Sequence, residues 1–290
     1  MSEPRITAFF DEATFTITYL VVDLETSRAV IIDPVLDYDH RGGSLSTRSA
    51  QAVLDAAAEQ GAKIDYILET HVHADHISSA PFLKAQTGAK IVIGSSIDKI
   101  QKTFAPVFQA NDLSMTGGEF DILATDGQVL QFGGQEIKVI HMPGHTPACV
   151  AYHIGSHVFV GDTLFMPDYG TARCDFPGGD AAALYRSIQK IFAMPPETKL
   201  WMCHDYKAAG RDHYAWESDV ATQRAHNIHI HDGVTEAEFV AMRQTRDKGL
   251  APPVLLLPSV QVNMRAGYFP PADQAGKRYL LIPVSGTIPN

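Results

Sequence analysis

The sequence has few cysteines, no long apolar run and no excess of positive charge. The three cysteines, Cys149, Cys174 and Cys203, are an odd and sparse set, so we expect no disulfide framework and a reducing, cytoplasmic setting. No stretch of about 18 consecutive apolar residues is present, which argues against a membrane-spanning helix. Acidic residues occupy the amino-terminal segment where a signal peptide would have its apolar stretch, so we expect no secretion signal.

Acidic residues outnumber basic ones, with 33 Asp and Glu against 23 Lys and Arg and a formal net charge of −10. This balance argues against nucleic acid or an anionic membrane as the main partner. It does not exclude a small anionic substrate, which needs only a local arginine or lysine. The 290 residues are 45% hydrophobic, and no Gly/Ser-rich linker divides them. We therefore predict one domain over 1–290, with a core at about 5–210 and a carboxy-terminal elaboration at about 211–290.

Strand-like and helix-like patterns alternate along the chain. β-rich runs, helix formers with stop signals, and glycine-containing turns predict these elements: strands at 6–10, 15–23, 28–33, 64–70 and 89–94, helices at 45–60 and 81–88, hairpins at 129–144 and 148–162, a helix at 180–193, a strand at 199–203, and helices near 213–227 and 235–248. The Pro- and Gly-rich tail at 250–290 is expected to wrap the surface with short strands. This order of elements indicates a layered α/β sandwich.

Thirteen histidines are the unusual feature of the composition, and four ligand-type side chains lie within six residues: His71, His73, Asp75 and His76. In extended backbone, residues two apart point to the same side, so His71 and His73 can face one point. If the chain then turns helical, Asp75 and His76 can project back towards the same space. Packing alone does not account for such a cluster, and we predict a metal site.

Three further ligand-type residues, His145, Asp162 and His204, follow strand-like runs later in the chain. Each alone would be an ordinary loop residue, but ligands presented from several strand ends are what a rigid metal site at one edge of a sheet needs. Imidazole and carboxylate suit Zn, Fe, Ni or Mn. Because the cluster contains no cysteine, a catalytic site with open positions is favoured over a closed structural zinc site.

The motif series THVHADH (70–76), Asp33, His145, Asp162 and His204 resembles that of the metallo-β-lactamase superfamily over about residues 15–206. The resemblance implies an αββα sandwich with a carboxy-terminal extension. It leaves the reaction open, since that superfamily includes hydrolases, nucleases and oxygenases.

A closer resemblance to the persulfide dioxygenases extends over most of the chain. It rests on the segments at 15–39, 70–81, 143–150, 161–165, 173–176, 203–206 and 258–267, the last containing Asn-Met-Arg. The segment 166–179 is most similar to a bacterial branch known loosely as β-lactamase-like hydrolases. The chain departs from the mitochondrial type around 35–47, 95–118 and 166–179, which leaves its substrate preference open.

The resemblance implies a mononuclear Fe(II), one per chain, held by His71, His145 and Asp162, with Zn as the alternative metal. Around this ion it implies a second set of ligand-type residues, which support the first site or bind a second metal: His73, Asp75, His76 and His204. Asp33 is expected to orient the 70–76 loop by accepting hydrogen bonds rather than to bind metal.

The implied substrates are glutathione persulfide and O₂, and the products are sulfite and glutathione. Glutathione has two carboxylates, so its pocket needs a cation and hydrogen-bond donors. Arg173, Tyr206 and Arg265 occupy family-like positions and are our substrate-binding candidates, with a surface ion pair as an equal alternative for each arginine. No rhodanese-type cysteine loop is present, so a sulfurtransferase partner would be a separate protein. A homodimer is expected by analogy.

Two alternatives remain open at this point. The first is a hydroxyacylglutathione hydrolase of the glyoxalase II type, with two metals activating a hydroxide against a thioester; the Asn-Met-Arg segment and Pro-rich tail lack the usual helical glutathione-binding domain of that family. The second is a metal- or sulfide-responsive sensor. A secreted β-lactamase is not expected without a secretion signal. The histidines at 226, 229 and 231 are expected to lie in a solvated segment, and the cysteines to be buried.

Overall fold

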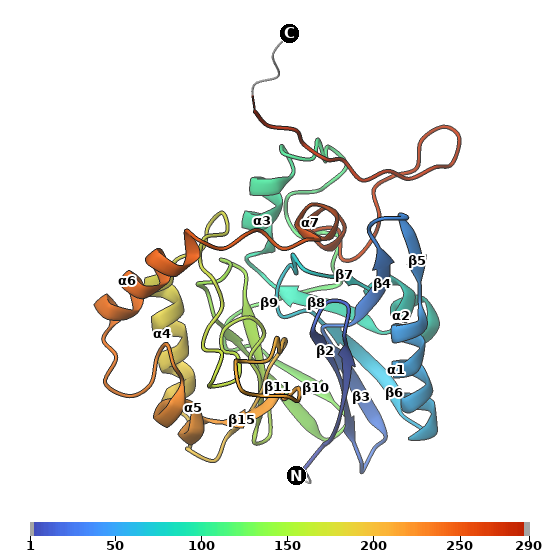
Figure 1. Cartoon of the computed structure of the whole chain (residues 1–290). Coiled ribbons are helices and arrows are strands. Elements are labelled where there is room, and N and C mark those ends of the chain that lie inside the picture. The colour runs from blue at the N-terminus through green and yellow to red at the C-terminus, as the bar shows by residue number, and fades with distance from the viewer. Residues whose placement is uncertain (1–2, 287–290) are drawn as a thin grey trace.

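Two six-stranded sheets pack face to face in the computed structural model, which describes residues 3–286 (Figure 1). In spatial order, the first sheet consists of β1 (Arg5–Asp11), β2 (Thr16–Asp23), β3 (Arg28–Ile32), β6 (Lys63–Leu68), β8 (Lys90–Gly94) and β9 (Ile122–Ala124). Strands β1 to β3 are antiparallel, and β3, β6, β8 and β9 are parallel. All eight residues of β2 are buried, because both faces of this sheet are covered.

The second sheet is mostly antiparallel. Its order is β10 (Val129–Phe132), β11 (Gln135–His141), β12 (Val150–Ile154), β13 (His157–Phe159), β14 (Lys199–Trp201) and β15 (Glu217–Asp219). Only β13 and β14 pair in parallel. The predicted hairpin turns are present, and Gly133 and Gly155 take positive φ values of 56° and 59° that favour glycine.

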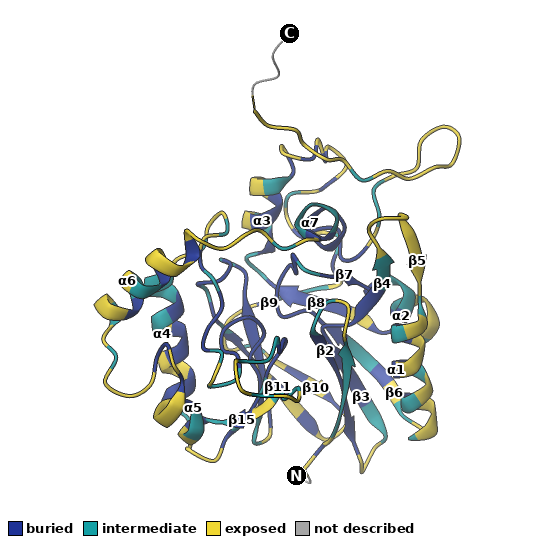
Figure 2. Ribbon diagram, viewed as in Figure 1, coloured by how far each residue is buried: buried dark blue, intermediate teal, exposed yellow. Residues whose placement is uncertain are grey.

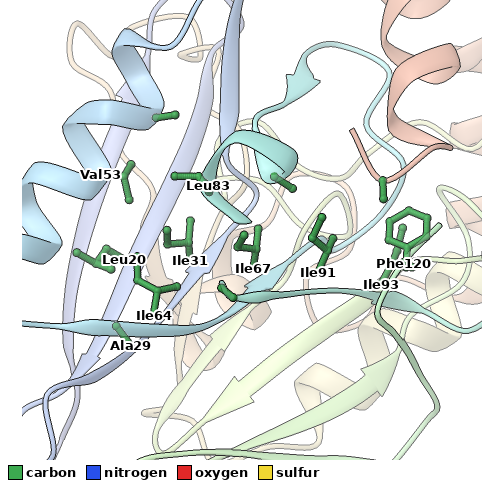
Figure 3. Packing of buried hydrophobic residues seen from close by; sticks show 14 of the residues in the cluster. Leu20, Ala29, Ile31, Val53, Ile64, Ile67, Leu83, Ile91, Ile93 and Phe120 are labelled. Atoms are coloured by element: carbon green, nitrogen blue, oxygen red, sulfur yellow. The ribbon is translucent and has the colours of Figure 1, made fainter. Parts of the chain in front are cut away.

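Helices cover the outer face of each sheet. On the first sheet they are α1 (Arg48–Glu59), α2 (Ala80–Thr87) and α3 (Ile97–Phe104); on the second they are α4 (Ala181–Phe192), α5 (Val220–His226) and α6 (Glu236–Asp247). The alternation along β2 sets these layers. Leu20 packs towards the helices (Figure 3), whereas the side chains of Tyr19 and Val21 pack towards the second sheet. The predicted αββα sandwich is confirmed.

A small third sheet lies beside the first. It consists of β5 (Ser44–Ser46), β4 (Val35–Asp39) and β7 (Ile77–Ser78), and β5 is exposed (Figure 2). Helix α7 (Leu256–Asn263) packs against β7, which brings the carboxy-terminal region to the end of the 70–76 loop. Residues of the β4–β5 hairpin and of the segment before α7 line the same cavity.

Two sequence predictions about the carboxy-terminal region are wrong. The helix predicted at 213–227 begins only at Val220, because residues 217–219 pair with β14 as strand β15. The tail holds helix α7 and, between residues 250 and 286, no strand; Pro258 is tolerated because it lies in the first turn of α7. Within residues 3–286, no helix combines the length and apolar character needed to cross a membrane.

Candidate metal centre

Strand ends from both sheets meet at one edge of the sandwich. Asp33 follows β3 and His71 lies just beyond β6, in the first sheet. His145, Asp162 and His204 follow β11, β13 and β14, which run in the same direction in the second sheet. The fold therefore brings ligand-type residues from distant segments of the sequence together at this edge.

His71, His145 and Asp162 form the first donor cluster. The Nε2 atoms of His71 and His145 lie 3.8 and 3.7 Å from Oδ2 of Asp162, and one donor atom of each residue lies within 4.8 Å of the others. Two donors that each bind a metal at about 2.1 Å are at most about 4.2 Å apart. The arrangement has the size that one shared ion requires.

A second cluster contains the remaining ligand-type residues, and its members are His73, Asp75, His76 and His204. Nε2 of His204 lies 3.1 Å from Oδ2 of Asp75 and 3.5 Å from Oδ1 of Asp162. The two oxygens of Asp162 thus face different clusters. The donor set can accommodate one or two ions.

In both histidines of the first cluster, one ring nitrogen is hydrogen-bonded and the other faces the cluster. Nδ1 of His145 donates to the carbonyl of Arg173 at 2.8 Å, and Nδ1 of His71 lies 3.0 Å from Oγ1 of Thr70. Nε2 of His71 is buried and has no hydrogen-bond partner within the described chain. Burial, together with neighbouring imidazoles, lowers the pKa of His71 well below its usual value. A neutral imidazole with a free lone pair is the form that binds metal.

The second cluster follows the same rule. Nδ1 of His76 and of His204 lie 3.3 and 3.4 Å from Oγ1 of Thr16. Their Nε2 atoms have no hydrogen-bond partner among residues 3–286, and that of His204 faces the carboxylates of Asp75 and Asp162. In His73 the two ring nitrogens exchange roles. Its Nε2 bonds to Asp33 Oδ1 at 2.9 Å, and its Nδ1 has no hydrogen-bond partner among the described residues. Buried nitrogens without partners are costly in a folded protein, and their convergence here fits bound metal cations.

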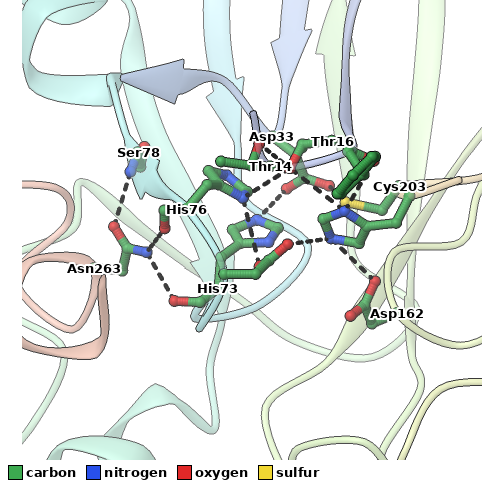
Figure 4. A network of polar contacts seen from close by, with 12 residues as sticks. Thr14, Thr16, Asp33, His73, His76, Ser78, Asp162, Cys203 and Asn263 are labelled. Atoms are coloured by element: carbon green, nitrogen blue, oxygen red, sulfur yellow. Dashed lines mark hydrogen bonds and ion pairs between the residues drawn. The ribbon is translucent and has the colours of Figure 1, made fainter. Parts of the chain in front are cut away.

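Asp33 holds the loop that carries four of the donors. Its Oδ1 accepts a hydrogen bond from His73 (Figure 4). The same oxygen accepts from the Thr70 amide at 2.7 Å, and Oδ2 accepts from the Thr70 hydroxyl at 2.8 Å. Although burial would raise the pKa of Asp33, the His73 imidazole and the Thr70 donors lower it. Sequence reasoning missed Glu69, which is buried 3.4 Å from His73 and accepts from Ser78. An acidic residue directly before the histidine run was its signal.

A cavity of about 870 Å³ opens in front of the first cluster. His145, Asp75 and Asp162 line it together with an aromatic group consisting of Phe15, Phe165, Tyr169, Phe176 and Tyr206. The Tyr206 ring stacks on His204 with centroids 5.7 Å apart. Burial, aided by Asp75 and Asp162, raises the pKa of Tyr206, so its hydroxyl stays protonated and can donate a hydrogen bond.

The two predicted substrate-binding arginines have protein partners. Arg173 lines the cavity, but its guanidinium donates to Asp175 at 2.6 and 2.7 Å and to the Ala251 carbonyl. Arg265 is not among the lining residues: it is buried and forms a two-pronged ion pair with Asp112 at 2.8 and 2.9 Å. The structure thus places Arg265 as a link between α7 and the loop after α3.

Four cavity-lining arginines were not predicted, and one of them, Arg48, forms an exposed ion pair with Asp37 at 3.3 Å. Arg243 is buried and bonds to Asp247 and to the Thr171 carbonyl. Arg41 and Arg246 are exposed, and neither has an ion-pair partner within residues 3–286. The available signal was the spacing of Arg243 and Arg246, which lie three apart on one face of a predicted helix.

One histidine in the carboxy-terminal region is not solvated as predicted. His229 is 9% exposed, and its Nδ1 accepts a hydrogen bond from the Thr171 amide at 3.0 Å. Its position under the Thr171 turn explains the burial. The three cysteines are free and buried as predicted, and burial raises the pKa values of Cys149 and Cys174 to about 12. Their thiols are therefore poor nucleophiles.

Comparisons with known proteins agree with this geometry. A probable metallo-hydrolase of Burkholderia pseudomallei is 50% identical over 290 residues, covering 96% of this chain and 98% of that protein. Glyoxylase B2 of Dictyostelium discoideum is 42% identical and covers 98% of each chain. The mitochondrial persulfide dioxygenase of Bos taurus is 32% identical, covering 89% of this chain and 87% of that protein.

The crystal structure of ETHE1 from Myxococcus xanthus has a TM-score of 0.73 and 29% identity, covering 91% of this chain and 100% of that one. A sequence model of the metallo-β-lactamase superfamily matches residues 13–204, which contain all seven donors of the two clusters. The chain belongs to the metallo-β-lactamase superfamily, and a persulfide dioxygenase and a probable metallo-hydrolase are among its relatives.

Proposed function

We propose that this protein is a persulfide dioxygenase, which converts glutathione persulfide, O₂ and water into glutathione and sulfite with one Fe(II) per chain. The observation that carries the proposal is the cluster of His71, His145 and Asp162 at the inner end of an open cavity. Two histidines and one carboxylate with open positions are typical of non-haem iron oxygenases. Similarity to persulfide dioxygenases over most of the chain supports the same conclusion.

His71, His145 and Asp162 would hold the ferrous ion, which supplies open coordination positions and redox chemistry with O₂. The hydrogen bond from His145 to the Arg173 carbonyl keeps Nε2 directed at the cluster. The phenyl rings of Phe165 and Phe176 line the cavity beside His145 and Asp162 and limit water near the reacting sulfur.

The cavity suits a tripeptide thiol derivative. Its volume of about 870 Å³ lies within the usual range for small-molecule sites. Arg246 and Arg41 line it as cations without ion pairs among the described residues, and each can bind a substrate carboxylate. The Tyr206 hydroxyl is a neutral donor near the metal end. We propose these three residues, rather than Arg265, as the substrate contacts, with Arg173 holding the cavity wall.

The second candidate function is a two-metal hydroxyacylglutathione hydrolase. It is favoured by the second cluster and by Asp162, whose two oxygens face both clusters. The relatives described as a probable metallo-hydrolase and a glyoxylase agree with it. In this case Asp162 would lie between two ions and a hydroxide would attack a glutathione thioester.

Oxygen uptake and metal analysis separate the two functions. Full-length protein purified without oxygen is expected to contain about one iron per chain, to consume O₂ with glutathione persulfide, and to release sulfite. Thioester cleavage under anaerobic conditions, with two metals per chain and no O₂ uptake, would instead establish the hydrolase. A protein that binds persulfide and does neither would be a sensor.

We further propose that the core and the carboxy-terminal residues form one domain and that the protein works in the cytoplasm. Phe239 of α6 packs in the same apolar cluster as α4 and the second sheet. Three unpaired cysteines agree with a reducing compartment. Limited proteolysis that released a stable fragment ending near residue 210 would contradict the single domain.

A further inference from the structure

The side chain of Asn263, the last residue of α7, reaches into the loop that carries four metal donors. Its Nδ2 donates to the carbonyl of His73 at 2.8 Å and to the carbonyl of His76 at 2.7 Å, and its Oδ1 accepts from the Ser78 amide at 2.9 Å (Figure 4). Asn263 is 5% exposed. Three hydrogen bonds thus join the carboxy-terminal region to the loop.

The contact satisfies backbone groups that lack regular partners. Residues 69–76 form neither helix nor strand, so the carbonyls of His73 and His76 have no ladder or helical hydrogen bond. A primary amide can donate twice and accept once from the same side chain. An asparagine at this position matches all three loop groups, which neither an acid nor an alcohol of similar size can do.

We propose that Asn263 is a positioning residue for the metal centre, acting through the backbone of the 70–76 loop. Asp33 fixes the start of that loop at Thr70, and Asn263 fixes its end at His73 and His76. The backbone on both sides of Asp75 is therefore held, and with it the free Nδ1 of His73 and Nε2 of His76. The inference does not depend on which reaction the centre supports.

Helix α7 is itself held firmly enough for this role. Gln101 of α3 donates to the carbonyl of Met264 at 3.0 Å, and Arg265 pairs with Asp112. Buried Val260 and Met264 pack against Phe108 beyond α3. The anchor of the metal loop thus lies outside residues 13–204, the part of the chain that matches the superfamily model.

The test uses the full chain loaded with Co²⁺ and challenged with a competing chelator. Asn263→Ala removes all three hydrogen bonds, whereas Asn263→Asp keeps an acceptor for the Ser78 amide but places an oxygen against the two carbonyls. Gln261→Ala is the matched control, because Gln261 lies on the same helix and bonds to the Leu281 backbone instead of the metal loop. The readouts are the Co²⁺ dissociation constant, the visible Co²⁺ spectrum, and hydrogen exchange of the Ser78 amide.

We expect both Asn263 variants to weaken Co²⁺ binding by roughly 10- to 100-fold, as removal of supporting contacts around metal ligands does. Hydrogen exchange of the Ser78 amide should accelerate in Asn263→Ala but remain slow in Asn263→Asp, which keeps the acceptor for that amide. The comparison separates loss of the two hydrogen bonds to the His73 and His76 carbonyls from unfolding of the loop. Co²⁺ binding within twofold of wild type in both variants would overturn the proposal. Equal weakening in Gln261→Ala would overturn it too, because the effect would then come from helix stability; if Asn263→Ala does not fold, Asn263→Asp carries the test.

Discussion

The inner end of the cavity and its mouth hold their polar side chains in different ways. At the inner end, Asp75, His145 and Asp162 line the cavity, and three further donors of the metal centre, His71, His76 and His204, are not among the lining residues. These three are at most 2% exposed, and each has one ring nitrogen next to a hydrogen-bonding neighbour. At the mouth, Arg41 and Arg246 are exposed and have no ion pair among residues 3–286. The metal donors at the inner end are held in place, whereas the arginines at the mouth are exposed cations that can bind a ligand.

This difference supports the proposal that the inner end binds metal and the mouth binds substrate. A metal centre needs donors held within a fraction of an ångström, so the fold buries them and supports them from Asp33 and Asn263. Recognition of a carboxylate tolerates more movement, since an exposed guanidinium can adjust to its ligand. Changes at the inner end should therefore affect metal content, and changes at the mouth should affect substrate affinity alone.

The largest effect is expected from Asp162→Ala. Asp162 contributes oxygens facing both clusters and is the only anionic donor of the first one. We expect metal content and activity to be lost together, as measured by metal analysis and O₂ uptake on the same sample. Asp168→Ala, which removes an exposed partner of Arg211, is the control and should retain both. Full metal content in Asp162→Ala would contradict the assignment of the first cluster.

His204→Ala tests whether one cluster or two bind metal. His204 faces Asp75 and Asp162 Oδ1 but is not part of the first cluster. For the dioxygenase we expect about one iron per chain to remain, with activity reduced by roughly 10- to 100-fold. His145→Ala, the matched variant in the first cluster, should lose the iron. If His204→Ala also empties the site, the mononuclear assignment is wrong.

Arg246→Gln tests the mouth. Loss of one charge-assisted contact to a substrate carboxylate costs about 1.4 kcal/mol, so KM for glutathione persulfide should rise about tenfold while kcat and iron content stay unchanged. A short alkyl persulfide without carboxylates should show no such difference. Arg224→Gln is the control, since Arg224 pairs with Asp232 and does not line the cavity. An unchanged KM would remove Arg246 from the substrate site.

The smallest effect concerns His229, which lies behind the mouth. Burial, with the Arg243 guanidinium adding to it, lowers the pKa of His229 to about 4. Because the pKa is about 6.5 in the unfolded chain, the stability that neutral His229 provides is present above pH 6.5 and is lost as the pH falls towards 4. We expect the free energy of unfolding to drop by about 1 kcal/mol more between pH 7 and 5 than in His229→Asn, allowing for solvent screening. Urea titrations of both proteins measure this, and equal pH dependence would contradict it.

The inner end was largely predictable from the sequence because its donors directly follow strands and obey local spacing rules. The arginines at the mouth were not predictable, because whether an arginine is free to bind substrate depends on which acidic residues the fold brings next to it. Arg265 and Arg246 look equivalent in sequence, yet Arg265 meets Asp112 whereas Arg246 meets no acid within the described chain. Asn263 likewise belongs to no periodic pattern, and its role depends on where α7 packs. The same applies to β15, whose strand conformation comes from pairing with β14.

The origin of the first cluster in two different sheets has a thermodynamic consequence. His71 comes from the first sheet, whereas His145 and Asp162 come from the second. An ion that needs all three can bind only when the two halves of the sandwich are docked, so cofactor occupancy and cooperative folding are linked. A shortage of the bound metal in a cell would then reduce not only turnover but also the lifetime of the protein itself.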